Sequence, residues 1–184
     1  MTKLNKNQQA PAFEMKDLYG KSIKLGNYKG KKVLLAIFRY ASCPFCNLRV
    51  HELIKNYEKL KNEGLEIIAV FKSTEAEIKK YVNTQKPPFT IIPDEKGVLY
   101  QKYGIEKSFA GFLKSMLRVS ELVYTMRKGF FSLKTLPEPQ LIPGDFLINE
   151  KGMIEEAYYG KDFGDHLPLE KIKKWLEKEV VGVG

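Results

Sequence analysis

The sequence is poor in the residues that build metal sites and membrane spans. It holds two cysteines, two histidines and one tryptophan in 184 residues. No stretch of about 18 residues is free of charge, which excludes a membrane-spanning helix. Zinc takes about four ligands, and besides the cysteine pair the chain offers only His51 and His166, so we expect no metal. The first ten residues are polar and lack the apolar core of a signal peptide. We therefore expect a cytoplasmic protein, in which a lone cysteine pair is catalytic rather than structural.

The chain has fewer acidic residues, 22 Asp and Glu, than basic ones, 31 Lys and Arg, and its formal net charge is +9. The positive residues are scattered along the chain and form no cluster interleaved with aromatic residues, which argues against a nucleic-acid partner. At 43% hydrophobic residues, the chain can bury a sizeable core. The length suits a single domain, 1–184, with residues 1–9 as a flexible tail.

Both cysteines lie in one short stretch, residues 37–48, with two residues between them. The continuous apolar run 33–38 before them predicts a strand buried on both faces. The amphipathic run after them predicts a helix that begins near Pro44, where proline is well tolerated. Cys43 would then sit at a helix N-terminus, whose positive end favours a thiolate. Because Cys46 follows within disulfide reach, the sequence predicts a reactive dithiol.

Strand and helix patterns alternate along most of the chain, which predicts an α/β layered domain. A hairpin is expected near residues 13–25, and a helix from Pro44 to about Gly64. The connection from the first strand through that helix to the second implies a parallel crossover. The remaining expected elements are a strand at 65–71, a helix from 75, a strand at 89–92, a short helix at 98–104, a hairpin of 146–148 with 154–159, and a last helix from Pro168.

Residues 105–136 interrupt this alternation. Apolar residues recur there at helical spacing over more than five turns, with Lys114, Arg118 and Arg127 among the charged positions. The pattern predicts one inserted basic amphipathic helix. We expect it to pack on the domain or against a second copy in a homodimer. Two functional alternatives are a lid over the dithiol and a contact with a membrane surface or an acyl chain, of which we do not favour membrane contact.

The cysteine motif resembles that of the thioredoxin superfamily. The local sequence is similar to that of the alkyl hydroperoxide reductase/thiol-specific antioxidant family, in its peroxiredoxin-like branch with a C-P-F-C pair. The residues that carry this similarity are Phe38-Arg39 and Cys43-Pro44-Phe45-Cys46. The resemblance covers residues 10–104 and 140–180 and leaves the insertion unexplained. It implies a thioredoxin-like fold, a central mixed sheet flanked by helices, with a helical insertion.

The resemblance also implies roles for individual residues. Cys43 would be the nucleophile and Cys46 the resolving thiol, with Pro44 opening the helix. In this superfamily a cis-proline before a late strand lies against the dithiol, and the backbone preceding it pairs with substrate. Ile142 and Pro143 hold that position here, which predicts a cis bond between them.

Four other residues are candidates for the site, Arg39 and Tyr40 as supporting residues. Arg39 would support a thiolate or orient a peroxide; the alternative is a surface arginine paired with a carboxylate. Tyr40 would pack beside the site. His166, in a late loop with Asp165, would shuttle protons or only cap the loop. Asp145 would oppose the thiolate if it is buried.

Three functions remain open. The first is a thiol–disulfide oxidoreductase that cycles Cys43 and Cys46 between dithiol and disulfide. The second is a thiol peroxidase with Cys43 peroxidatic and Cys46 resolving. Peroxiredoxins usually place Pro seven and Thr or Ser three residues before that cysteine, and the sequence has Ala36 and Tyr40 there. The third is a non-enzymatic redox-sensing module.

The expected partners follow from these functions. The substrate would be a protein or small-molecule disulfide, or a peroxide. A thioredoxin- or glutathione-type reductant would regenerate the dithiol. The sequence implies no separate organic cofactor.

Overall fold

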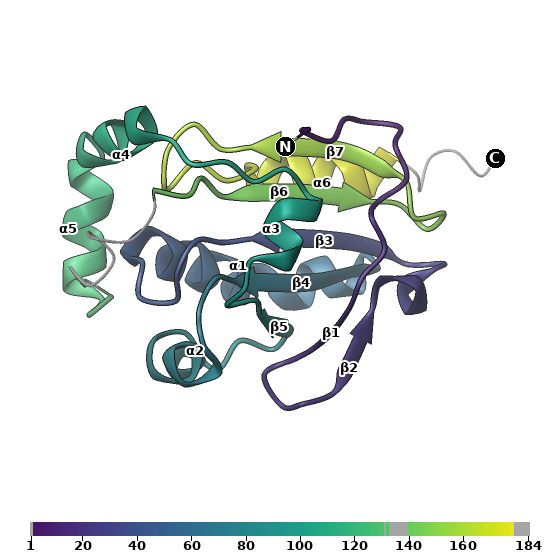
Figure 1. Ribbon diagram of the computed structural model, residues 1–184, viewed down its shortest axis with the longest axis horizontal. Coiled ribbons are helices and arrows are strands. Elements are labelled where there is room, and N and C mark those ends of the chain that lie inside the picture. The colour runs from purple at the N-terminus through teal and green to yellow at the C-terminus, as the bar shows by residue number, and fades with distance from the viewer. Residues whose placement is uncertain (1, 131, 133–139, 179–184) are drawn as a thin grey trace.

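The protein is built around a five-stranded mixed sheet (Figure 1). The structure, a computed structural model, describes residues 2–130, 132 and 140–178. The strand order is β5-β4-β3-β6-β7. These strands are β3 (Lys32–Ile37), β4 (Leu65–Phe71), β5 (Thr90–Pro93), β6 (Gly144–Ile148) and β7 (Ile154–Tyr159). A separate hairpin pairs β1 (Glu14–Lys16) with β2 (Ser22–Lys24).

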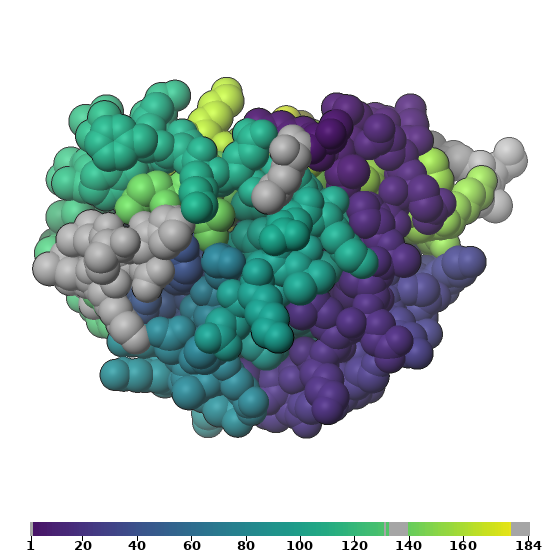
Figure 2. Space-filling view, viewed as in Figure 1, coloured from purple at the N-terminus to yellow at the C-terminus, as the bar shows by residue number. Residues whose placement is uncertain are grey.

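Helices cover both faces of the sheet (Figure 1). Their bounds are α1 (Pro44–Asn62), α2 (Glu75–Tyr81), α3 (Val98–Lys102), α4 (Phe109–Met116), α5 (Val119–Arg127) and α6 (Leu169–Lys178), with short 3₁₀ turns at Leu25–Tyr28 and Asn83–Gln85. In Figure 1, α1 and α6 lie behind the sheet and α3 in front of it, while α4 and α5 form one end of the molecule. Figure 2 shows the N-terminal segment and the α3 region packed side by side over the front face.

Strand β3 separates two apolar cores because its side chains alternate between the faces. Leu34 and Ala36 belong to the core under α1 and α6, together with Val50 of α1. Leu35 and Ile37 belong to the opposite core, under α3 and the N-terminal segment. All six residues of β3 are buried, as the continuous apolar run predicted.

The pairing of β3 confirms the predicted topology. It runs parallel to β4, and β4 runs parallel to β5, so α1 is the predicted parallel crossover. On its other side β3 runs antiparallel to β6, which forms the predicted hairpin with β7. The sheet is therefore mixed and flanked by helices, with the cysteine motif at the C-terminal end of its central strand.

Part of the segment predicted as a flexible tail, residues 7–9, pairs with the start of β7. Asn7 N–H donates to the carbonyl of Ile154, and Ile154 N–H donates to the carbonyl of Gln8. Gln9 also forms an isolated bridge with Met153. This pairing satisfies backbone groups at the start of β7.

The inserted segment is two helices rather than the one predicted. Helix α4 ends at Met116 and α5 begins at Val119, with Ser108 capping α4 through the N–H of Gly111. Arg118, at the junction, is tied to Asp162 on a distant loop, so the chain turns there to meet that loop. The end of the predicted segment and the predicted linker at 136–139 lie outside the described residues. No described helix has the length and apolarity needed to cross a membrane.

Candidate active site

The dithiol lies in the turn that joins β3 to α1. Cys43 is the residue before the helix, in an extended conformation, and Pro44 is the first helical residue, as the sequence predicted. The Asn47 side chain donates to the carbonyls of Ala41 and Cys43, at 2.7 and 3.0 Å. Ser73, in the loop after β4, accepts a hydrogen bond through its Oγ from the Ala41 N–H. These bonds hold the turn in one conformation.

Both cysteines are reduced and enclosed. Cys43 is 1% exposed and Cys46 is not exposed at all. Two cavities flank the turn without including either sulfur: one is lined in part by Phe45, the other by Tyr40 and Ser42. The sulfur of Cys43 is therefore almost completely covered.

Arg39 is the cation at this site. Its side chain is buried, with Nη1 3.4 Å from Cys43 Sγ. Its Nε donates to the Leu141 carbonyl at 2.6 Å, and its Nη2 donates to the Gln140 side chain. Both of these partners are neutral, so the charge of Arg39 faces the sulfur without a carboxylate beside it. Arg39 is therefore not the surface arginine paired with a carboxylate that was the alternative interpretation.

The environment favours a thiolate at Cys43. Burial by itself would raise the pKa of the Cys43 thiol, because a buried charge loses hydration. The Cys46 thiol and backbone amide and the charge of Arg39 oppose this effect and lower the pKa of Cys43 to about 5. The direction of this shift favours the anionic form of Cys43.

Cys46 is affected in the opposite direction. Burial, the hydrogen bond to Cys43 and the negative charge of Cys43 raise the pKa of Cys46 well above the ordinary value. Arg39 acts against this rise. The two shifts favour an anion at Cys43 and a retained proton at Cys46. The roles of nucleophile and resolving thiol stay a prediction.

The cis geometry predicted for the Ile142–Pro143 bond is wrong: the described residues contain no cis peptide bond. The segment before Pro143 pairs with the start of the insertion. Ile142 N–H donates to the carbonyl of Glu106, and Ser108 N–H donates to the carbonyl of Gln140. This pairing keeps the chain extended into Pro143, where trans is the ordinary state of the bond. It also occupies the N–H of Ile142, part of the backbone that was expected to pair with substrate.

Asp145 and His166 come together with each other rather than with the dithiol. Asp145 is fully buried in β6, and its carboxylate lies 3.2 Å from His166 Nδ1 and accepts from the N–H of Leu167. Burial would raise the pKa of Asp145, but His166, Arg49 and the Leu167 amide lower it below the ordinary value. Within the described residues, neither side chain has a hydrogen bond to a cysteine.

Tyr40 packs beside Arg39, whose guanidinium carbon is 5.7 Å from the centre of the Tyr40 ring. Sequence analysis did not identify Phe163. The guanidinium carbon of Arg39 lies 3.2 Å from the centre of the Phe163 ring. No pattern in the sequence marks Phe163, because it reaches the site from a loop. Asn47 was also missed, although a polar residue on the buried side of an amphipathic helix is a usable signal.

Metal ligands do not gather in the part of the chain that the structure describes. It contains no group of three or more His, Cys, Asp or Glu side chains placed to hold an ion.

The central sheet and the dithiol at the start of α1 define a thioredoxin-like protein. Two solved structures share the fold. The thioredoxin domain of a thiol-disulfide oxidoreductase from Bacteroides vulgatus aligns with a TM-score of 0.62 at 22% identity, over 94% of this chain and 99% of that one. Peroxidoxin BcpB from Mycobacterium tuberculosis aligns with a TM-score of 0.68 at 9% identity, over 98% and 99%.

The chain belongs to the AhpC/TSA family, which matches residues 7–157. A putative peroxiredoxin bcp of Buchnera aphidicola is 26% identical over 90% of this chain and 91% of its own length. The chloroplastic peroxiredoxin Q of Populus jackii is 29% identical over 60% of this chain. That match spans about half, 52%, of the plant protein.

Proposed function

We propose that the protein is a thiol–disulfide oxidoreductase that cycles Cys43 and Cys46 between dithiol and disulfide. The supporting observation is the pair itself: a sulfur whose pKa is lowered to about 5 beside a buried thiol whose pKa is raised. Membership of the AhpC/TSA family agrees with cysteine redox chemistry.

In the first step the Cys43 thiolate attacks one sulfur of a substrate disulfide. A bond forms between that sulfur and Cys43, the substrate S–S bond breaks, and the other half leaves as a thiolate that takes a proton from solvent. The charge at Cys43 disappears in this step, and Arg39 loses its anionic partner.

In the second step Cys46 resolves the mixed disulfide. Two of the effects that raise its pKa, the hydrogen bond and the charge of Cys43, are gone once Cys43 is bonded to substrate. Arg39 still favours the anion, so Cys46 loses its proton more easily. It attacks Cys43 Sγ, the intramolecular disulfide forms, and the second substrate half leaves as a thiolate. The substrate disulfide is reduced to two thiols, and the protein dithiol is oxidised.

Peroxide reduction is the second candidate, and the enclosure of Cys43 favours it. At 1% exposure the sulfur suits a small reactant better than a protein disulfide. The thiolate would attack the distal peroxide oxygen, giving a sulfenic acid and an alcohol or water. Cys46 would then attack that sulfur and release water. The position three residues before Cys43 holds the buried Tyr40 in place of a serine or threonine.

An external thiol would complete either cycle by reducing the Cys43–Cys46 disulfide. A thioredoxin- or glutathione-type reductant fits this step. A redox-sensing module would use the same disulfide without turnover, and α4–α5 would be its responsive element.

Parallel rate measurements test these functions. The reduced protein is mixed with hydrogen peroxide in a stopped-flow instrument, and the same preparation is assayed for reduction of insulin disulfides. We expect disulfide turnover that Cys43→Ser abolishes and that Cys46→Ser arrests at a mixed disulfide.

The outcomes separate the candidates. Rapid peroxide consumption without disulfide turnover would move the assignment to the peroxidase. Slow reaction with both hydrogen peroxide and insulin, together with reversible formation of the Cys43–Cys46 disulfide, would favour the redox-sensing module. An unreactive Cys43 would overturn the whole proposal.

A further inference from the structure

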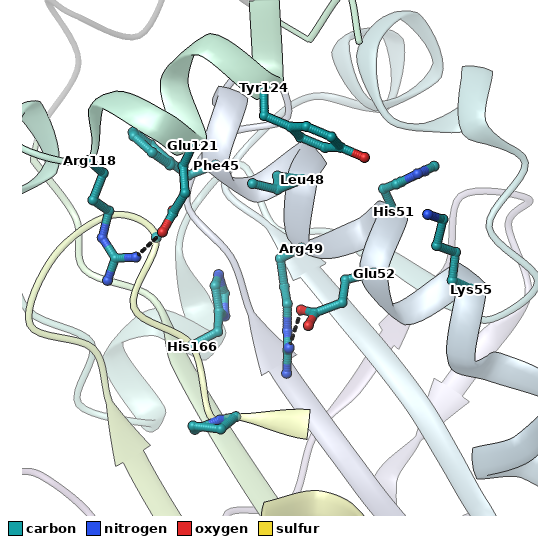
Figure 3. Close-up of a pocket in the computed structure, with 12 residues that line it drawn as sticks. Phe45, Leu48, Arg49, His51, Glu52, Lys55, Arg118, Glu121, Tyr124 and His166 are labelled. Atoms are coloured by element: carbon teal, nitrogen blue, oxygen red, sulfur yellow. Dashed lines mark hydrogen bonds and ion pairs between the residues drawn. The ribbon is translucent and has the colours of Figure 1, made fainter. Parts of the chain in front are cut away.

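A cavity of about 410 Å³ lies beside the dithiol turn, between α1, α5 and the loop 162–168 (Figure 3). Phe45, Leu48 and Tyr124 form apolar walls. Phe45 stands between the two cysteines in sequence, yet neither cysteine lines the cavity. Its size is within the range of small-molecule sites.

Most charged groups of this cavity are already paired. Arg118 binds Glu121 of its own helix and Asp162 of the loop. Arg49 uses one Nη nitrogen for Glu52 and the other for the carbonyl of Leu167. Both lining carboxylates are therefore held by arginines, as the dashed lines in Figure 3 show.

Unpaired nitrogens remain, and they are buried. Arg49 Nε and His166 Nε2 have no hydrogen-bond partner within the described chain, although the two residues are only 6% and 8% exposed. His51 Nε2 also lacks a partner there, although the residue as a whole is only half-buried. A buried polar atom without a partner is costly, so several around one cavity point to a ligand.

The partner of His166 defines what its free nitrogen can do. Asp145 is ionised, since its pKa is lowered, and it has no proton to give. Nδ1 of His166 must therefore carry the proton that faces this carboxylate. Nε2 is left as an acceptor in the neutral ring and a donor in the charged ring. A carboxylic acid group suits both states, because acid and imidazole share one proton.

We propose that this cavity binds a small organic monocarboxylate. One carboxylate oxygen would accept from Arg49 Nε–H and the other would share a proton with His166 Nε2. The apolar walls of Phe45, Leu48 and Tyr124 would cover the hydrocarbon part of the ligand.

The charge balance disfavours a multiply charged ligand. Three cations, Arg49, Lys55 and Arg118, line the cavity with the carboxylates Glu52 and Glu121, and Asp162 also pairs with Arg118. The cavity therefore has no excess of positive charge to neutralise several negative charges. Inorganic phosphate, with more charge and no apolar part, would leave the walls uncovered.

NMR titration of the full-length reduced protein tests this site. The probes are phenylacetate, its uncharged isostere phenylacetamide, and inorganic phosphate at the same ionic strength. We expect saturable shifts of the Gly164 amide and the His166 ring with phenylacetate, at an affinity at least about tenfold above that for the amide. One carboxylate–cation pairing lost at a buried site is expected to cost at least this factor.

Two matched variants of His166 test the role of its Nε2 nitrogen. His166→Asn keeps an N–H near the position of Nδ1 for Asp145 and removes Nε2. His166→Gln places an N–H near the position of Nε2. We expect about tenfold weaker phenylacetate binding in the first and a smaller loss in the second. Leu48→Trp should block binding by filling the cavity, and Arg127→Gln, an exposed charge on α5, should not alter it.

The proposal is overturned by equal affinity for acid and amide, by a preference for phosphate, or by undiminished binding in Leu48→Trp. It does not depend on the redox assignment, because binding is measured without turnover. Cys43→Ser should therefore bind phenylacetate as the unmodified chain does.

Discussion

The guanidinium carbon of Arg39 lies 3.2 Å from the centre of the Phe163 ring, so the cation that faces Cys43 is covered by an aromatic side chain from the loop after β7. Phe163 in turn donates its backbone N–H to Ser115 Oγ of α4 and packs against Phe112 at 5.8 Å between ring centres. The insertion thereby supports the thiolate site through one loop, without touching either sulfur in the described contacts.

Replacing Arg39 should raise the pKa of Cys43 from about 5 towards its ordinary value. Arg39→Met removes both the charge and the N–H that faces the sulfur. Arg39→Lys keeps the charge but lacks the planar guanidinium with its several N–H donors. We expect a larger rise in the methionine variant. Thiolate absorbance against pH measures the shift, and Cys46→Ser variants of each protein serve to assign the signal. An unchanged titration would show that Arg39 does not stabilise the anion.

The lowered pKa of Cys43 also predicts how stability depends on pH. A thiol whose pKa is depressed on folding contributes stability above its unfolded pKa, near 9.0, and loses it as pH falls towards about 5. The reduced protein should therefore lose stability relative to Cys43→Ser on acidification through this window. The slope is at most about 1.4 kcal/mol per pH unit for one proton.

Denaturant unfolding of both proteins at several pH values checks this. A parallel pH dependence in the two would contradict the thiolate assignment. The oxidised protein, which has no ionisable thiol, is the second control.

The site was predictable where its residues are neighbours in sequence. The C-x-x-C spacing, the apolar run before it and Pro44 place the dithiol at a strand-to-helix turn, since each depends on local chemistry. Arg39 was found for the same reason. Phe163 was not, because its contact with Arg39 joins positions far apart in the sequence, and no periodic pattern marks a loop residue.

The insertion and Pro143 show a second limit. Apolar spacing continued across Leu117 and predicted one helix, but the ion pair of Arg118 with Asp162 accompanies a break that spacing alone does not reveal. The trans bond before Pro143 likewise accompanies pairing of 140–142 with 106–108, which belongs to the insertion. A resemblance that omits the insertion could not include its effect on neighbouring segments.

Replacing Asp145 should destabilise the fold and change its acid sensitivity. Its buried carboxylate holds His166 and the Leu167 amide, and Asp145→Asn breaks the pair, at a cost of about 3–5 kcal/mol. Because the pKa of Asp145 is lowered on folding, its stabilisation exists above the unfolded value of about 3.9 and disappears as pH falls through the folded value. The difference between the two proteins should thus shrink below about pH 4. Thermal unfolding at pH 7 and pH 3 measures it, and a constant difference would contradict the argument.

Removing one hydroxyl of the insertion should open the dithiol. Ser115 Oγ accepts from Phe163 N–H and donates to the Gly111 carbonyl, and it is buried. In Ser115→Ala the Phe163 N–H loses its partner, at a local cost of about 1–3 kcal/mol. The loop would then release Arg39 more often, and Cys43 would be exposed more often. We expect alkylation of Cys43 by iodoacetamide to accelerate several-fold, whereas Ser120→Ala, at an exposed position of α5, should leave the rate unchanged. If Ser115→Ala lowers global stability without a faster alkylation, the loop and α4 do not control access, and the enclosure of Cys43 must be relieved elsewhere.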